Sequence, residues 1–169
     1  MNDPFATLGV PARFTFAPGD LEQRHRDLSR ALHPDRYVNA PAGERRVALE
    51  RAVSVNDAFR ALKDTLTRAQ SLLALHGLSI REGERAAPAL LMEIMELREE
   101  LDAVRTKPER VAALRETVSA RVAAEERVVA EVFDREGTPD ATELARARDA
   151  VVKLRYFRRF QEEADALDE

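Results

Sequence analysis

The sequence predicts an all-α fold built from two helical modules. Alanine, leucine, arginine and glutamate dominate the 169 residues, and glycine occurs only six times, a composition typical of helices. Apolar residues also recur at 3.6-residue spacing in several segments that end at proline or glycine. We find no internal repeat that would indicate a solenoid.

Composition narrows the classes of function. The chain has no cysteine, which excludes disulfides and thiolate metal sites. Its net charge of −4 argues against general nucleic-acid binding. No apolar run approaches the ~20 residues that a membrane span requires, and no signal-peptide pattern opens the chain, so we expect a cytoplasmic protein without membrane contact.

A short helical segment opens the chain and a longer helix follows. Asp3 can cap the first segment, and Gly9 suits its end. The longer helix is expected to begin near residues 18–20 and to run into the sequence LHPDRY at residues 32–37. Pro34 disfavours a helical conformation in the residue before it, so the helix must end there.

A loop of about ten residues is expected to lead to a third and a fourth helix. The third is predicted from roughly residue 43 to residue 64, and the fourth covers LTRAQSLLALHG, ending at Gly77. The second and third helices would pack antiparallel around the loop. The apolar positions that indicate the third helix are Ala48, Ala52, Val55, Phe59, Leu62 and Leu66.

Three further helical stretches are predicted beyond a linker that contains Gly83 and Pro88. They cover about 88–105, 109–136 and 140–167, and a proline-containing breaker separates each from the next. Three long helices with short turns predict an antiparallel bundle. The expected organisation is a module over 1–77, a linker over 78–87 and a three-helix bundle over 88–169.

The tripeptide His33-Pro34-Asp35 allows several interpretations when it is taken alone. It could be an ordinary helix end, where the histidine meets the helix dipole and the aspartate starts a turn. It could hold an acid–base pair, but no nucleophile lies nearby in sequence. The other histidines are His25 and His76, and three scattered histidines make a poor metal set. We therefore expect no metal site.

The context of the tripeptide resembles a J-domain. In that family an amphipathic helix, the tripeptide, a loop and a second long helix follow one another, and the tripeptide stimulates ATP hydrolysis by a DnaK-class chaperone. The arginines around it could be an ordinary solvated helix face or could meet an acidic partner. The chaperone-binding residues that the resemblance implies are His33, Pro34, Asp35, Arg24, Arg26, Arg30 and Arg36.

A longer resemblance covers nearly the whole chain, from FATLGVPARF to KLRYFRRF. The blocks VNDAFRALKD, LTRAQSLLALHG and LMEIMELREELD are similar to the HscB family of iron–sulfur co-chaperones, in its bacterial form. In that family a J-domain packs on a C-terminal three-helix bundle, which binds the scaffold protein IscU and brings it to the chaperone HscA. Departures from the family pattern are His25 for an aromatic, Thr65 for a proline, Ser71 for a tyrosine and Ala103 for an acid.

The helix that opens the bundle carries a second candidate surface. Leu90, Ile94, Leu97, Leu101 and Val104 form a stripe that suits the bundle core. The flank beside it could be a wide core face or a partner site, and spacing alone leaves both open. The resemblance implies a scaffold-binding site of Leu91, Met92, Met95, Glu96, Arg98, Glu99 and Tyr156.

The expected function is therefore that of an adaptor without catalytic residues, cofactor or metal of its own. No G-x-x-x-x-G-K-[ST] pattern indicates an ATP site. We expect a monomer or a weak dimer. Two alternatives stay open: a general J-protein that presents unfolded clients, and a helical structural or dimerisation module. An enzyme is a distant third because nothing in the sequence indicates an active site.

Overall fold

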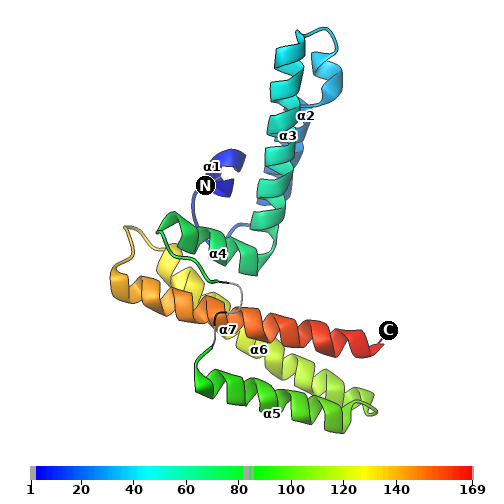
Figure 1. Ribbon diagram of the computed structural model, residues 1–169, viewed down its shortest axis with the longest axis vertical. Coiled ribbons are helices and arrows are strands. Elements are labelled where there is room, and N and C mark those ends of the chain that lie inside the picture. Colours follow the sequence, from blue (N-terminus) through cyan, green and yellow to red (C-terminus); the bar gives the residue numbers. More distant parts are fainter. Residues whose placement is uncertain (1–2, 82–83, 85, 169) are drawn as a thin grey trace. The chain divides into compact units, whose positions relative to one another are not determined.

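The computed structural model describes residues 3–81, 84 and 86–168, and this part of the chain is helical without any strand. The all-α prediction is confirmed. The chain divides into two compact units, Met1–Gly77 and Leu78–Glu169 (Figure 1). No helix in the described residues is both long and apolar enough to cross a membrane.

The N-terminal unit is a helical hairpin with two shorter helices at its base. Helices α2 and α3 run side by side, and α1 and α4 pack against the end of α3 that lies away from the turn (Figure 1). The elements are α1 (Pro4–Leu8), α2 (Asp20–Ala31), the 3₁₀ turn η1 (Pro34–Tyr37), α3 (Ala42–Lys63) and α4 (Thr65–Leu75).

The turn of the hairpin is more ordered than predicted. The sequence suggested a loop of about ten residues, whereas Pro34–Tyr37 forms a turn of 3₁₀ helix. Proline suits the first position of such a turn because its φ is already fixed and its missing N–H is not needed. Helix α3 spans Ala42–Lys63, so it begins and ends one residue before the range of about 43–64 that the sequence predicts.

The base of the hairpin is closed by aromatic stacking. The rings of His25 on α2 and Phe59 on α3 lie 4.2 Å apart with 12° between their planes. The Nε2 atom of His25 is also 2.8 Å from Oδ1 of Asn56, which satisfies the polar edge of the ring. His25 therefore packs in the position where the family usually has an aromatic residue.

Arg68 on α4 connects three segments of the N-terminal unit. Its Nε atom donates to the carbonyl oxygen of Leu62 at 2.6 Å, and Nη1 donates to the carbonyl oxygen of Phe14 at 2.7 Å. The guanidinium group also lies 5.6 Å and 5.4 Å from the ring centres of Phe14 and Phe16. The loop before α2 is thus fastened to the α3–α4 junction, a role that the sequence did not indicate.

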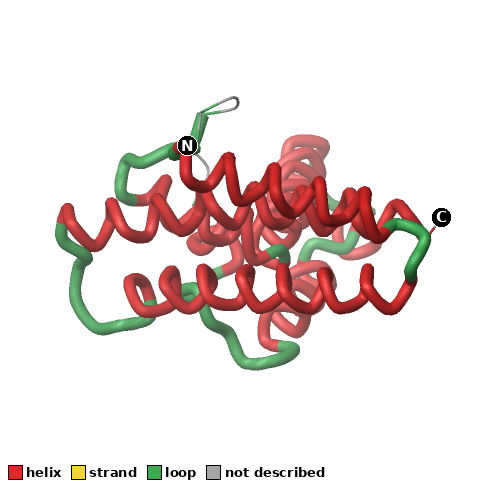
Figure 2. The backbone as a smooth tube through the Cα atoms, turned by 90° about the horizontal axis from the view of Figure 1, so that it is seen from below, coloured by secondary structure: helices red, strands yellow, loops and turns green. Residues whose placement is uncertain are grey.

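The C-terminal unit is the expected antiparallel bundle of three long helices: α5 (Pro88–Val104), α6 (Pro108–Phe133) and α7 (Ala141–Asp165), with a short 3₁₀ turn, η2 (Ala166–Asp168), at its end (Figures 1 and 2). Four residues of the predicted α5 stripe are buried, and Leu97 is half-buried. Phe157 and Phe160 on α7 are fully buried and fill the centre.

Two candidate interaction surfaces

The tripeptide is exposed at the turn of the hairpin. His33 has an extended backbone, with φ −60° and ψ 134°, as expected for a residue before proline. Its Nδ1 atom accepts a hydrogen bond from the backbone N–H of Asp35 at 3.3 Å. The two side chains are 59% and 86% exposed, so both are accessible to a partner.

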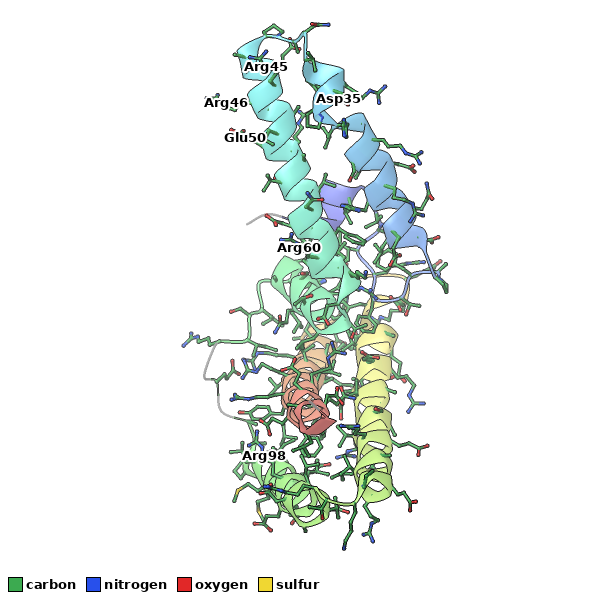
Figure 3. All side chains as sticks on the ribbon, turned by 90° about the vertical axis from the view of Figure 1, so that its right-hand side faces the viewer. Asp35, Arg45, Arg46, Glu50, Arg60 and Arg98 are labelled. Atoms are coloured by element: carbon green, nitrogen blue, oxygen red, sulfur yellow. The ribbon has the colours of Figure 1, made fainter. Side chains whose placement is uncertain are left out.

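This geometry suits recognition better than catalysis. When Nδ1 accepts the N–H of Asp35, the proton of the neutral imidazole is on Nε2, and the ring presents a donor to the outside. The Asp35 carboxylate lies on the same turn, 3.5 Å from the ring, and adds an acceptor (Figure 3). Within the described part of the chain, no group of three histidine or acidic side chains could hold a metal ion.

The four arginines near the tripeptide have different roles. Arg24 donates from Nε to the carbonyl oxygen of Leu8 at 2.6 Å and so ties α2 to the end of α1. This structural contact was not predicted, and the chaperone-binding role of Arg24 stays a prediction. Arg26, Arg30 and Arg36 are exposed. The first two lie one turn apart on α2, and the third is on η1, next to Asp35.

The second candidate surface lies on the outer side of α5. Met92 and Met95 are 62% and 59% exposed, which is unusual for large apolar residues. Glu96 and Glu99 beside them are also exposed, and Leu91 is half-buried. We call these five residues the α5 flank. The bundle core does not use the two methionines, so the wide-core interpretation is wrong for them.

Arg98 has a partner that the sequence did not reveal. Its Nε and Nη2 atoms donate to the two carboxylate oxygens of Glu163 on α7, at 2.8 Å and 2.6 Å (Figure 3 labels Arg98). The hydrogen bonds from this pair raise the pKa of Arg98, and its charge is held against that carboxylate. The structure therefore gives Arg98 a role in fastening α5 to α7.

Tyr156 is half-buried on α7, off the core face that contains Leu154 and Phe157. The guanidinium group of its neighbour Arg155 lies 5.8 Å from the centre of the tyrosine ring. Helix α7 packs against α5, the helix that carries the methionines. An aromatic ring with one accessible face on this helix is a suitable binding anchor.

The predicted linker is partly fixed to α7 by two arginines. Arg155 donates to the carbonyl oxygens of Arg81 and Glu84 at 3.0 Å and 3.1 Å. Arg148 forms an ion pair with the Glu84 carboxylate. The hydrogen bond from Arg148 is the main reason why the pKa of Glu84 lies below its ordinary value. We call Arg81, Glu84, Arg148 and Arg155 the linker clamp.

We expect Glu84→Gln to loosen the linker clamp at neutral pH. Because the pKa of Glu84 is lowered in the folded protein, its carboxylate is ionised at any pH above the ordinary glutamate pKa. Its stabilising ion pair is lost only when the pH falls through the lowered pKa. Glutamine imitates the protonated form. Hydrogen exchange of the Arg81 and Glu84 amides should be faster in this variant at fixed pH, whereas Glu99→Gln on exposed α5 should not change it. Equal exchange in wild type and Glu84→Gln would contradict the clamp.

An exposed His-Pro-Asp turn on a two-helix hairpin, together with a three-helix bundle, defines a class of protein: a J-domain co-chaperone with its own C-terminal helical unit. The family model described as "HSCB C-terminal oligomerisation domain" matches residues 86–165. A "Co-chaperone protein HscB homolog" from Bordetella parapertussis is 39% identical over 138 residues, which are 80% of this chain and 81% of that protein.

Solved structures agree with this similarity. The chaperone HscB from Vibrio cholerae superposes with a TM-score of 0.79 at 30% identity, covering 99% of this chain and 98% of that one. The human co-chaperone protein HscB superposes with a TM-score of 0.85 at 25% identity, covering 97% and 81%. The chain therefore belongs to the HscB family of co-chaperones, and the predicted J-domain and C-terminal bundle are confirmed.

Proposed function

We propose that this co-chaperone joins a folded iron–sulfur scaffold protein of the IscU type to a DnaK-class chaperone of the HscA type and stimulates the ATPase of that chaperone. One observation carries the proposal: a tripeptide in an ordered turn is exposed at the turn of the N-terminal hairpin, with 59% and 86% of its two polar side chains accessible. The chain itself would supply contacts and no catalytic group.

The N-terminal unit makes the chaperone contact. Pro34 stiffens the turn, and the hydrogen bond from the Asp35 N–H to His33 orients the imidazole ring. A partner therefore meets an imidazole that is already oriented by the turn, which lowers the entropic cost of binding. Arg26, Arg30 and Arg36 add positive charge that speeds the encounter with an acidic surface.

The C-terminal unit makes the scaffold contact through the α5 flank. Met92 and Met95 are exposed and flexible, so they can adapt to the surface of another folded protein. Glu96 and Glu99 form a charged rim, and Tyr156 supplies an aromatic anchor on α7. The ion pair between Arg98 and Glu163 holds the two helices in register beneath this surface.

Placing both contacts on one chain raises the local concentration of the scaffold at the chaperone. Docking of the tripeptide would favour the hydrolysis-competent state of the chaperone, and couplings of this kind are typically about 1–3 kcal/mol. The same two contacts on separate chains would lack this advantage at low concentration.

Self-association through the bundle is a second candidate function. The description of the matching family model names an oligomerisation domain, and residues 86–165 contain the exposed methionines. A second copy of the chain could cover Met92 and Met95 in place of a scaffold. Sedimentation velocity at micromolar concentration separates the two cases, because only self-association predicts a dimer that Met92→Ala weakens.

Calorimetry with two clients tests the proposed function. The full chain should bind a purified, folded iron–sulfur scaffold in a saturable manner and should not bind a permanently unfolded protein. This outcome is expected because a few anchors with a charged rim on one helix suit the surface of a folded partner. Binding of the unfolded protein instead of the scaffold would favour the general J-protein and contradict the proposal.

A further inference from the structure

Charged side chains make up 34% of the residues, so large apolar side chains on the surface need an explanation. They gather at two places. Among the described residues, eight large hydrophobic side chains are exposed. Two belong to the α5 flank. Four others lie in the half of the N-terminal hairpin that is nearer the turn, namely Val38, Val47, Leu49 and Val53. The second group has no role in the fold or in the function proposed so far.

A hollow of about 230 Å³ opens between η1 and the first half of α3. Leu32, Pro34 and Tyr37 form one wall, and Ala48 and Leu49 lie opposite. The lining is mainly apolar, although it opens to solvent. We call this hollow the tip groove.

The tip groove exists because the hairpin is filled unevenly. At the base, His25 stacks on Phe59. Nearer the turn, two of the four α3 residues that line the hollow are the small Ala48 and Ala52. Leu32, the residue that follows α2, is half-buried, and its exposed apolar surface is available for contact.

A second hollow of about 260 Å³ shares Leu32, Tyr37 and Ala48 with the tip groove. The ring of Tyr37 is held by a hydrogen bond from its hydroxyl group to the carbonyl oxygen of Ala31 at 3.3 Å. This second hollow is also lined by Glu44 and Arg51, so it is more polar than the tip groove. The tip groove, with Tyr37 in its wall, is the better receptor for an apolar side chain from another molecule.

The occupant follows from two features of the groove. Pro34 belongs both to the tripeptide and to the groove wall, so a protein that covers the tripeptide also reaches the mouth of the groove. Arg45 is part of the lining, and Arg36 lies on η1, the turn that contains Pro34 and Tyr37 of the groove wall. These two positive charges favour acidic groups next to the occupant (Figure 3 labels Arg45 and Asp35 at this end of the hairpin).

We propose that the tip groove receives an aliphatic side chain from an acidic segment of the chaperone that docks on the tripeptide. This inference rests on the proposed function and adds a specificity contact to it. The tripeptide would trigger hydrolysis, whereas the groove would hold the partner in place. Loss of the tripeptide should therefore lower the maximal stimulated ATPase rate. Loss of the groove contact should instead raise the co-chaperone concentration that gives half of that rate.

Leu49→Asn in the full chain tests the groove. Leu49 is 61% exposed, so the substitution removes little from the core. In a steady-state assay with a purified DnaK-class chaperone, the concentration for half-maximal ATPase stimulation should rise about tenfold, the loss expected for a truncated interface anchor. The maximal stimulated rate should stay the same.

Val53→Asn is the matched control. Val53 is 53% exposed on the same helix, one turn further along, and does not line the groove. It should leave the titration unchanged.

If Leu49→Asn behaves like this control while His33→Gln abolishes stimulation, the groove inference is overturned and the proposed function stands. If wild type stimulates no DnaK-class chaperone, both fail. If Leu49→Asn changes the sedimentation of the co-chaperone when no chaperone is present, the groove is an interface between two copies of this chain. This result would also overturn the inference.

Discussion

His33→Gln is expected to abolish stimulation of the chaperone ATPase while circular dichroism and thermal unfolding stay close to wild type. The side chain is 59% exposed, so its loss opens no cavity. Glutamine can accept with Oε1 and donate with Nε2, but it lacks the rigid ring and has one more torsion than histidine, so its donor is not held in the place of the imidazole Nε2–H. A steady-state ATPase assay with the full chain measures the effect.

Two further variants sharpen this test. Asp35→Asn keeps the shape of the side chain and removes its charge, so we expect a similarly strong loss. Glu44→Gln removes a carboxylate from the first turn of α3 near the same end of the hairpin and should have little effect. Full stimulation by His33→Gln would show that the tripeptide is only an ordinary turn.

Replacing Leu91, Met92 and Met95 together by alanine is expected to weaken scaffold binding at least about 30-fold, because loss of an interface hot spot costs about 2 kcal/mol or more. Two of the three side chains are more than half exposed, so the bundle core keeps its contacts. Alanine also favours helix, which protects α5 itself. Basal ATPase stimulation through the tripeptide should survive in this variant.

Leu167→Ala serves as the control for the triple variant. Leu167 is another exposed aliphatic residue of the C-terminal unit, but it lies in η2 and outside the α5 flank. Isothermal titration calorimetry should give wild-type affinity for this control. An unchanged affinity of the triple variant would remove the α5 flank from the account.

The helices could be predicted because their signals are local. Proline and glycine breakers mark the ends of α5, α6 and α7, and apolar spacing identifies the stripe that α5 buries. The exposed tripeptide was also predictable, since Pro34 ends α2 and excludes the turn from the core.

Contacts between distant side chains and backbone could not be predicted in this way. Arg24 contacts a carbonyl group of α1, and Arg98 contacts a carboxylate of α7; the sequence indicated neither contact, and the binding roles of both arginines stay predictions. The linker clamp and Arg68 are of the same kind. A guanidinium group can reach several acceptors, and only the packing of the helices decides which one it meets.

The tip groove was missed for another reason. Ala48 and Ala52 match the apolar spacing that predicts the third helix, but this spacing does not predict a hollow beside them. Spacing records which face is apolar and does not record how much volume the side chains fill. The hollow follows from the small size of these two residues opposite α2.

The central claim is that one chain must carry both contacts, and mixing two full-length variants tests it most directly. His33→Gln keeps the scaffold contact, and the triple alanine variant keeps the chaperone contact. At concentrations well below the separate dissociation constants, we expect wild type to give scaffold-enhanced ATPase activity and an equimolar mixture of the two variants to give none of that enhancement. Full enhancement by the mixture would contradict the account.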